Sequence, residues 1–301
     1  MPHNLFKIHE KEYVLPGTRA CQGCGLSIAY RFALKALRED TIVTFPACCL
    51  CVLHGLYPLT PVLVPSVNST FAATAASASG IAAGLAALNR TETTVVAFAG
   101  DGGTFDMGIQ ALSGAAERGT DFIYVAYDNE GYMNTGTQRS SATPMGALTT
   151  TTPVHTKQQH KKDFLKIMEA HQIPYIATAT PAYPIDLYDK FVRAKRIKGS
   201  RFIHIHTPCP PGWQYPTKDT IRIGRLAVDT GLCVLFEVEN GKFRFTGRSR
   251  TLAEKGNKLP VVHYVEKQGR FKKMSIEQLN QLQAWVDDRW EEYRRKAAES
   301  K

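Results

Sequence analysis

Two short apolar runs, each followed at once by polar residues, constrain the fold of this chain more than any other feature. The run at 95–99 leads into Gly-Asp-Gly at 100–102, and the run at 121–127 leads into Asp-Asn-Glu at 128–130. Nearly continuous apolar runs of this length are typical of buried parallel strands, and residues 106–117 between them have the pattern of a helix. Such a strand–helix–strand unit brings both polar clusters to one edge of a sheet, where open α/β sheets bind ligands.

These polar clusters carry the residue types of a magnesium–diphosphate site. Asp101 and Asn129 provide oxygen atoms of the kind that Mg²⁺ prefers, and the ion takes further oxygens from bound phosphates. The flanking glycines allow the backbone to approach a diphosphate closely. A Gly-Asp-Gly tripeptide followed after about 30 residues by an asparagine resembles the signature of enzymes that use thiamine diphosphate (ThDP). A simple turn between a strand and a helix is the alternative.

The rest of the chain alternates strands with helices, which predicts a doubly wound α/β domain with a parallel sheet. The loop at 135–156 is long enough to be a lid over the site or a contact with another subunit. We expect strands at 41–45, 94–99, 121–127, 174–178 and 201–206, and helices at 27–38, 70–88, 106–118, 161–170 and 184–197.

The C-terminal part of the chain has a different pattern. Residues 213–274 are less regular, so we divide the chain into a domain at 14–212 and an extension at 213–301. Ser275 and Gln278 form a capping-box pair in front of an apolar stripe. The extension should therefore end in a helix that docks on this chain or on a neighbouring subunit.

Composition narrows the class of protein. The chain has 301 residues, 44% of them hydrophobic and 21% charged, as in water-soluble globular proteins. No apolar stretch approaches the ~20 residues that span a bilayer, and the N-terminus lacks a secretory signal pattern, so we expect a cytoplasmic protein without a membrane contact. The net charge of +10 is spread along the chain without a nucleic-acid-binding motif. It predicts a basic face for acidic partners, protein or small anion, with an ordinary solvated surface as the alternative.

The seven cysteines predict a metal centre rather than disulfides, because their number is odd and no secretory signal is visible. Cys21 and Cys24 form a CxxC pair, and Cys209 lies between two prolines that fix the backbone. Four thiolates suit Zn²⁺ or an iron–sulfur cluster; unliganded core thiols are a third interpretation. A neighbouring ThDP site favours the cluster, because decarboxylation there leaves an electron-rich group that a one-electron acceptor can oxidise. The other cysteines are Cys48, Cys49 and Cys51, after the first predicted strand, and Cys233, which we expect in the core.

Five segments along the chain make the interpretation specific. They are GTRACQGCG at 17–25, AGDGGT at 99–104, YDNEGYMNTG at 127–136, QRSSATP at 138–144 and PCPPGW at 208–213. Together they resemble the ThDP-binding β subunit of the 2-oxoacid:ferredoxin oxidoreductases, the pyruvate synthase family. The resemblance extends from about residue 14 to the end of the chain, and unrelated folds would not carry all five segments in this order.

The resemblance implies one [4Fe-4S] cluster in this subunit. Its ligands would be Cys21, Cys24, Cys209 and a third cysteine in the stretch PACCLC at 46–51, where Cys49 aligns with the ligand of the family. The stretch departs from the family pattern, because Cys48 replaces a glycine and the following cysteine replaces an acidic or polar residue.

The resemblance also implies the cofactor ligands. Mg²⁺ would be held by Asp101, by the side chain of Asn129 and by the Gly131 carbonyl, and Asn134 would be catalytic, close to the reactive carbon of ThDP. The histidines of the same regions, at 54, 204 and 206, are expected to be structural or surface residues. The residues expected to bind ThDP are Gly100, Asp101, Gly102, Gly103, Thr104, Asn129 and Asn134.

The activity implied by the resemblance is the oxidative decarboxylation of a 2-oxoacid in the presence of coenzyme A, with electrons passing to the cluster and then to ferredoxin or a similar carrier. Pyruvate is the default substrate. Val62 and Ser66 stand where pyruvate-specific members are expected to carry tryptophans, so a branched or aromatic 2-oxoacid, or oxalate, is also possible. The chain should need partner subunits that bind the ThDP pyrimidine and coenzyme A and that carry ferredoxin-like clusters.

Two other classes of function stay open from the residues. One is a non-redox ThDP decarboxylase or carboligase subunit with a structural zinc. The other is a basic, zinc-stabilised binding protein without catalysis, against which the complete Gly-Asp-Gly and asparagine pattern argues.

Overall fold

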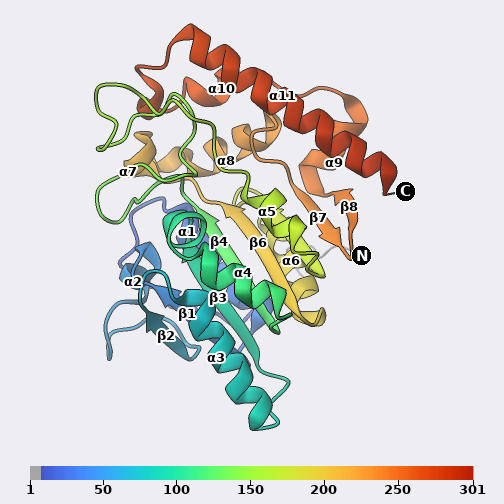
Figure 1. Ribbon diagram of the computed structural model, residues 1–301. Coiled ribbons are helices and arrows are strands. Elements are labelled where there is room, and N and C mark those ends of the chain that lie inside the picture. Colours follow the sequence, from blue (N-terminus) through green and yellow to red (C-terminus); the bar gives the residue numbers. More distant parts are fainter. Residues whose placement is uncertain (1–7, 301) are drawn as a thin grey trace.

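In the computed structural model, which describes residues 8–300, the strands form one eight-stranded sheet in the order β2-β1-β3-β4-β6-β5-β7-β8 (Figure 1). The first six strands in this order, from β2 to β5, run parallel to one another. Strand β7 pairs antiparallel with β5, and β8 pairs antiparallel with β7. The strands are β1 (Thr41–Pro46), β2 (Ser66–Ser69), β3 (Thr94–Gly100), β4 (Phe122–Asp128), β5 (Tyr175–Ala179), β6 (Ser200–His206), β7 (Phe236–Glu239) and β8 (Lys242–Phe245).

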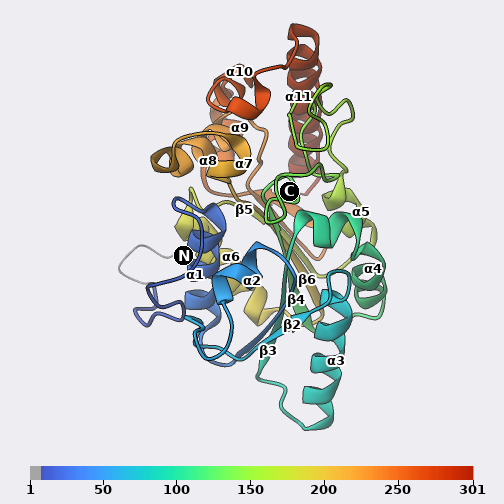
Figure 2. The same cartoon turned by 90° about the vertical axis from the view of Figure 1, so that its left-hand side faces the viewer.

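Helices cover both faces of the sheet, which confirms the doubly wound α/β fold (Figure 2). Alternate residues of a strand face opposite layers. Val96 and Phe98 therefore pack in the core on the side of α1 and α6, whereas Val95 and Ala97 pack on the side of α3 and α4. The first pair is α1 (Gly25–Leu37) and α6 (Pro184–Arg196); the other layer holds α3 (Thr74–Ala87), α4 (Ile109–Glu117) and α5 (Phe164–Ala170).

The segment 213–274 is more regular than its sequence pattern predicts. It begins with the end of α7 (Pro210–Trp213) and contains α8 (Thr220–Asp229), the hairpin of β7 and β8, α9 (Gly247–Lys255) and α10 (Val262–Val265). Asn240 and Gly241 have φ angles of 49° and 78°, as a two-residue type I′ hairpin loop requires. The Asn-Gly pair could have predicted the hairpin. The strands beside it are short and polar, so no apolar run revealed them.

The final helix forms as predicted. Ser275 Oγ accepts a hydrogen bond from the Gln278 backbone N–H, and the Gln278 side chain accepts one from the Ser275 N–H. Helix α11 (Ile276–Glu299) buries Leu282, Val286 and Trp290 against the rest of this chain. Figure 1 shows α11 lying across the end of the molecule that holds the extension. A third apolar cluster lies mostly in the extension and also includes Ala147 of the main domain, and the division at 212 stays a prediction.

Several boundaries differ from the sequence-based expectation. The helix expected at 106–118 is a π-helical turn (Gly102–Asp106) followed by α4, and the helix expected at 161–170 begins at Phe164. The edge strand β2 was not predicted, because it is short and largely exposed and therefore has no apolar run. Within residues 8–300, none of the helices has the length and apolarity needed to cross a membrane. The N-terminal residues in which we saw no secretory signal lie mostly outside the described part of the chain.

The parallel register brings the functional segments together at one edge. Gly100 at the end of β3 pairs with Tyr127 of β4, and Asp128 at the end of β4 pairs with His206 at the end of β6. The turns that follow these three strands therefore meet at the carboxyl edge of the sheet. Two further short helices flank this edge, α2 (Cys49–His54) after β1 and the 3-10 turn Gly269–Phe271 of the extension.

Candidate cofactor and metal site

A carboxylate, a side-chain amide and a backbone carbonyl converge at the ends of β3 and β4. One end of the Asn129 side-chain amide lies 3.0 Å from Asp101 Oδ1 and 3.0 Å from the carbonyl oxygen of Gly131. All three are acceptors when the amide oxygen points inward, and Asp101 and Asn129 are 1% and 5% exposed, so water does not separate them freely. Acceptors held this close need a cation between them, unless the amide is turned so that its NH₂ group donates to both neighbours.

The spacing fits magnesium. Ligand oxygens at 2.0–2.1 Å in an octahedral Mg²⁺ site lie about 2.9 Å apart along an octahedron edge, and the two separations here are 3.0 Å. The donor set, one carboxylate, one amide and one backbone carbonyl, is of the hard type that this ion selects. The residues predicted to hold Mg²⁺ are therefore brought together, and they fit the ion.

The carboxylate of Asp101 is oriented by a second contact. Ser140 Oγ donates a 2.5 Å hydrogen bond to Asp101 Oδ2, which leaves Oδ1 facing Asn129. Burial, and then the charge of Asp128, raise the pKa of Asp101 well above its ordinary value. A divalent cation between the oxygens would favour the ionised form and compensate for that burial.

The glycines of the Gly-Asp-Gly tripeptide make room for aromatic rings. A Cβ on Gly102 would lie 2.5 Å from the Tyr132 ring, and one on Gly100 would lie 3.1 Å from the Tyr127 ring. A small pocket lies here, lined by Gly100, Gly102, Gly103 and Tyr132 among others. Its volume of about 50 Å³ is far smaller than the ~300–1,000 Å³ usual for a ligand site. In this structure the Tyr132 ring fills space that the glycine pattern predicts for a cofactor.

Asn134 and Thr104 have different surroundings. Asn134 is exposed in the turn between Tyr132 and Gln138, and it lines the pocket beside the three converging oxygens. Thr104 is fully buried, and its Oγ1 lies 3.3 Å from the Tyr124 hydroxyl on β4. Thr104 is thus absent from the lining of this pocket.

The predicted thiol ligands come from three segments that face one another. The backbone N–H of Gly25 donates to the Pro208 carbonyl at 3.1 Å, which joins the CxxC loop to the turn of Cys209. Burial raises the pKa of the Cys49 thiol, and the charges of Cys209 and then of Cys48 and Cys24 raise it further. Burial also raises the pKa of Cys209 to about 12.

These thiols are neighbours but are not gathered into a ligand set. Cys21 is exposed, whereas Cys24, Cys49 and Cys209 are partly buried. Among the residues that the structure describes, no three His, Cys, Asp or Glu side chains are close enough to hold a metal as they stand. The Asn129 side-chain nitrogen lies 3.8 Å from Cys49 Sγ, so the oxygen site and the thiol region share a boundary.

Comparison with known proteins identifies the family. The model for the C-terminal TPP binding domain of thiamine pyrophosphate enzymes matches residues 49–205. The pyruvate synthase subunit PorB of Methanothermobacter marburgensis is 45% identical over 293 residues, which cover 96% of this chain and 99% of that protein. The ketoisovalerate oxidoreductase subunit VorB of Pyrococcus horikoshii is 45% identical over 296 residues, which cover 95% and 94%. The chain belongs to the ThDP-binding β subunits of the 2-oxoacid:ferredoxin oxidoreductases.

A solved structure agrees with the fold. One chain of the 2-oxoglutarate:ferredoxin oxidoreductase from Magnetococcus marinus superposes with a TM-score of 0.57 at 18% identity, over 75% of this chain and 84% of that chain. At this identity the similarity supports the fold alone.

A buried ion-pair cluster, which the sequence pattern did not reveal, lies beside the residues predicted to hold Mg²⁺. Glu130 contacts Lys161 and Arg270, and Asp128 contacts Lys161 at 3.1 Å and His204 at 3.0 Å. Both carboxylates are fully buried. The adjacency of Asp128 and Glu130 at a strand end was a visible signal, but their cations lie far away in the sequence.

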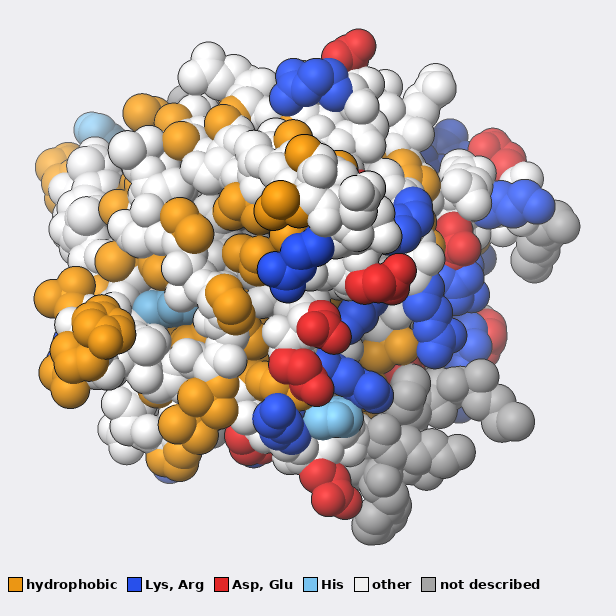
Figure 3. All heavy atoms as spheres, turned by 90° about the horizontal axis from the view of Figure 1, so that it is seen from below, with side chains coloured by type: hydrophobic (Ala, Val, Ile, Leu, Met, Phe, Trp, Pro, Cys, Tyr) orange, Lys and Arg blue, Asp and Glu red, His pale blue; other side chains and the backbone are white. Residues whose placement is uncertain are grey.

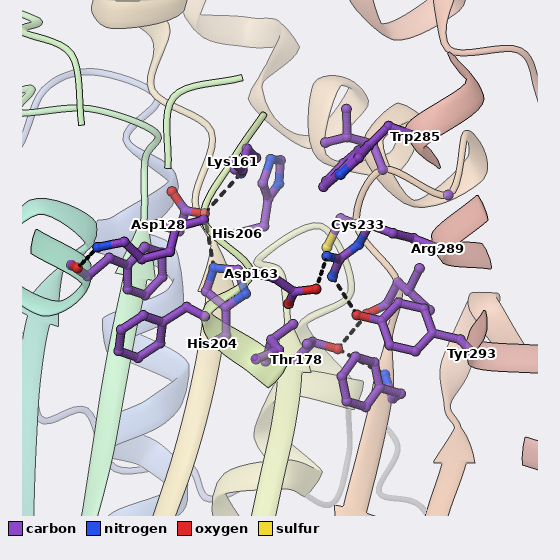
Figure 4. Close-up of a pocket in the computed structure, with 18 residues that line it drawn as sticks. Asp128, Lys161, Asp163, Thr178, His204, His206, Cys233, Trp285, Arg289 and Tyr293 are labelled. Atoms are coloured by element: carbon purple, nitrogen blue, oxygen red, sulfur yellow. Dashed lines mark hydrogen bonds and ion pairs between the residues drawn. The ribbon is translucent and has the colours of Figure 1, made fainter. Parts of the chain in front are cut away.

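Figure 4 shows a cavity beside this cluster, between the strand ends and α11. Its volume is about 70 Å³, and its lining includes Asp128, Lys161 and His204 on one side and Trp285 and Arg289 on the other. His204 is structural here, as expected, because its Nε2 is engaged by Asp128. His54 is structural as well: its Nε2 lies 2.8 Å from the Tyr30 hydroxyl, inside the core.

Proposed function

We propose that this chain is the β subunit of a cytoplasmic enzyme complex that oxidatively decarboxylates a 2-oxoacid, transfers the acyl group to coenzyme A and passes the electrons to a ferredoxin-type carrier. The single observation that carries the proposal is the convergence of the Asp101 carboxylate, the Asn129 amide and the Gly131 carbonyl next to the Cys49 thiol. ThDP, when bound, supplies the carbanion chemistry, and a [4Fe-4S] cluster supplies one-electron acceptance.

The residues of this chain then have separate tasks. Asp101, Asn129 and the Gly131 carbonyl would hold Mg²⁺, and through it the diphosphate of the cofactor. Asn134, exposed at the edge of the same pocket, would donate a hydrogen bond to the oxo or carboxylate oxygen of the substrate. Cys21, Cys24, Cys49 and Cys209 would hold the cluster, so the electron path from cofactor to cluster would pass the contact between Asn129 and Cys49.

The small pocket supports a role for partner subunits. A site of about 50 Å³ holds only part of a cofactor, and the remainder would be bound by the pyrimidine-binding partner. An apolar surface lies between α2 and β2, where Leu56, Tyr57 and Leu59 are 75%, 93% and 67% exposed. Figure 3 shows hydrophobic side chains gathered on one side of the face seen there. Exposed apolar surface of this kind marks a protein contact.

Two substrates compete for this assignment. Pyruvate is named for the relative from Methanothermobacter marburgensis and ketoisovalerate for that from Pyrococcus horikoshii, and both are 45% identical to this chain. Val62 is buried and Ser66 is exposed at the positions where pyruvate-specific members are expected to carry tryptophan. Smaller side chains there favour a branched 2-oxoacid as the second candidate.

A basic groove is the candidate docking surface for an acidic carrier. It has a volume of about 1030 Å³ and lies between α6, α8, α9 and β8. Its wall adjoins the thiol region, since a Cβ on Gly224 of α8 would lie 2.8 Å from Ala182 and 3.6 Å from Pro208. Opposite charge speeds encounter more than it tightens binding. The cationic residues of the groove are Lys190, Arg193, Arg196, Arg225, Arg244 and Arg250.

The test uses the complex purified without oxygen. We expect ThDP, magnesium and four iron atoms per β subunit, visible absorption that bleaches on reduction, and coenzyme A-dependent reduction of a low-potential dye with pyruvate or 2-oxoisovalerate. Zinc without iron would remove the redox function and leave the decarboxylase alternative. Absence of ThDP would overturn the site itself.

A further inference from the structure

The turn that carries two of the three metal oxygens, residues 128–131, is held from outside by the C-terminal extension. Arg270 Nη2 donates a 2.5 Å hydrogen bond to Glu130 Oε2. Lys161 Nζ donates a 2.6 Å bond to Glu130 Oε1. Glu130 is fully buried, so its charge requires these partners.

The backbone of the same turn is strained. Glu130 has a φ of 65°, in the left-handed region that residues with a Cβ seldom adopt. The Glu130 N–H donates to Asp128 Oδ1 at 2.9 Å, and the Thr143 hydroxyl donates to the Glu130 carbonyl at 2.8 Å. A conformation of this kind persists only where its surroundings hold it in place.

A second group of the extension holds the turn one residue earlier. The indole N–H of Trp213 donates a 2.8 Å hydrogen bond to the carbonyl of Asn129. The guanidinium of Arg270 lies 4.0 Å from the centre of the Trp213 ring. The two residues therefore form one stacked unit, which contacts both Asn129 and Glu130. The turn is thus held at two successive residues, Asn129 through its carbonyl and Glu130 through its side chain.

We propose that Arg270 and Trp213 are positioning residues for the Mg²⁺ site. By fixing residues 129 and 130 they direct the Asn129 side chain and the Gly131 carbonyl toward Asp101. This inference rests on the metal site in the proposed function. It explains why a buried ion pair, which contributes little net stability by itself, is placed here. Mg²⁺ demands near-ideal octahedral geometry, so a small displacement of the turn weakens its binding.

The arrangement also joins the two predicted centres. Trp213 ends the four-residue helix α7, whose N-cap residue is Cys209. The backbone N–H of Trp213 donates a 2.9 Å hydrogen bond to the Cys209 carbonyl. One end of this short segment thus carries a predicted cluster ligand, and the other holds the turn of the predicted Mg²⁺ ligands. A shift of Trp213 would change the separation of the two sites.

The test measures how ThDP binding to the full complex depends on the Mg²⁺ concentration, for the variants Trp213→Phe and Arg270→Gln. Binding is followed by isothermal titration calorimetry, which does not rely on tryptophan fluorescence. Trp213→Phe keeps an aromatic ring at this fully buried position and removes the N–H donor, and its melting curve without Mg²⁺ checks that the variant folds. Removal of a group that orients a metal ligand costs about 10–100-fold in metal affinity. We expect the Mg²⁺ concentration for half-maximal ThDP binding to rise by that factor in each variant.

The matched control is Arg289→Gln. Arg289 is also an arginine of the extension that pairs with a carboxylate of the main domain, Asp163 at 2.6 Å, but it does not reach the turn. Its melting temperature without Mg²⁺ should fall less than that of Arg270→Gln, because the pair of Arg289 with Asp163 is only partly buried, and its Mg²⁺ dependence should not change.

The outcomes separate the two levels of the argument. A wild-type complex that binds ThDP without any divalent cation would overturn the metal site and the positioning role together. Normal Mg²⁺ dependence in the wild type and an equal dependence in folded Trp213→Phe and Arg270→Gln would overturn the positioning role alone. An equal loss in Arg289→Gln would reduce it to general stability. As a second readout, Mn²⁺ in place of Mg²⁺ should give an altered electron paramagnetic resonance spectrum in Trp213→Phe.

Discussion

The oxygen side and the sulfur side of the site differ in how completely the chain builds them. On the oxygen side, Asp101 and Asn129 are buried, have named partners and stand 3.0 Å apart. On the sulfur side, Cys21 is exposed, and the other predicted ligands approach from separate loops without forming a ligand set. The difference shows what fixes the positions of the ligand residues in each site. Strand ends in a parallel ladder have a fixed register, whereas loops bearing thiols are ordered by the metal that they bind.

The largest effect should follow from removing a thiol ligand, because the sulfur side depends on its cluster. Cys209→Ala and Cys24→Ala should each reduce the iron content of the anaerobic complex to near zero and abolish ferredoxin reduction. Cys233→Ala, which changes a buried thiol among apolar residues, is the control and should keep its iron. Among the clustered cysteines, Cys49→Ala should have the strongest effect; iron that follows Cys48 instead would correct the register of that stretch.

The next effect concerns the oxygen side. Asp101→Ala removes the only anionic ligand among the three oxygens, so ThDP retention should fall by more than about 100-fold. Asn129→Ala should cost less, and Asn129→Asp should retain binding, because it keeps an oxygen at the ligand position. Asp106→Asn is the matched control, since Asp106 contacts Tyr132 rather than the oxygens predicted to bind Mg²⁺. Equal ThDP content in Asp101→Ala and wild type would disprove the assignment.

A third prediction compares the two sides directly by amide hydrogen exchange. Assembly of the cluster should slow exchange about 10-fold or more at 21–24 and 208–212, because these loops become ordered around it. Addition of Mg²⁺ to the ThDP-free complex should change exchange at 100–103 and 128–131 by far less. A large slowing on the oxygen side with none on the sulfur side would reverse the comparison.

The same contrast separates what the sequence reveals from what it conceals. Buried parallel strands were visible because both faces are covered, which gives continuous apolar runs such as that of β3. The meeting of Asp101 with Asn129 followed from the shared edge. The hairpin of β7 and β8 was concealed by its short polar strands, although Asn240 and Gly241 marked its turn. The partners of Glu130 were hidden too, because long-range ion pairs leave no periodic pattern.

A smaller effect is expected from the basic groove. Under limiting ferredoxin, the Arg196→Gln/Arg225→Gln variant should reduce ferredoxin several-fold more slowly at low salt, and the difference should shrink as screening shortens to ~8 Å at physiological ionic strength. Reduction of a neutral dye should be unchanged. Arg294→Gln, which changes an exposed cation of α11 away from the groove, should behave as wild type. If salt slows the reduction of ferredoxin and of the dye equally, the positive charge of the groove does not serve to attract the carrier.

The smallest effect tests how each side tolerates acid. The oxygen side pairs its buried charges, whereas α2 on the sulfur side ends in His54, whose pKa burial lowers to about 4. The unfolded chain protonates this residue near pH 6.5 and the folded chain only near pH 4, so folding stability is lost as the pH falls through this window. Between pH 7 and pH 6 the loss should be about 0.7 kcal/mol. Denaturant midpoints should show a shallower pH slope for His54→Gln, which keeps a hydrogen-bonding group for Tyr30 but does not titrate. An unchanged slope would mean that other groups control the acid response of this side of the molecule.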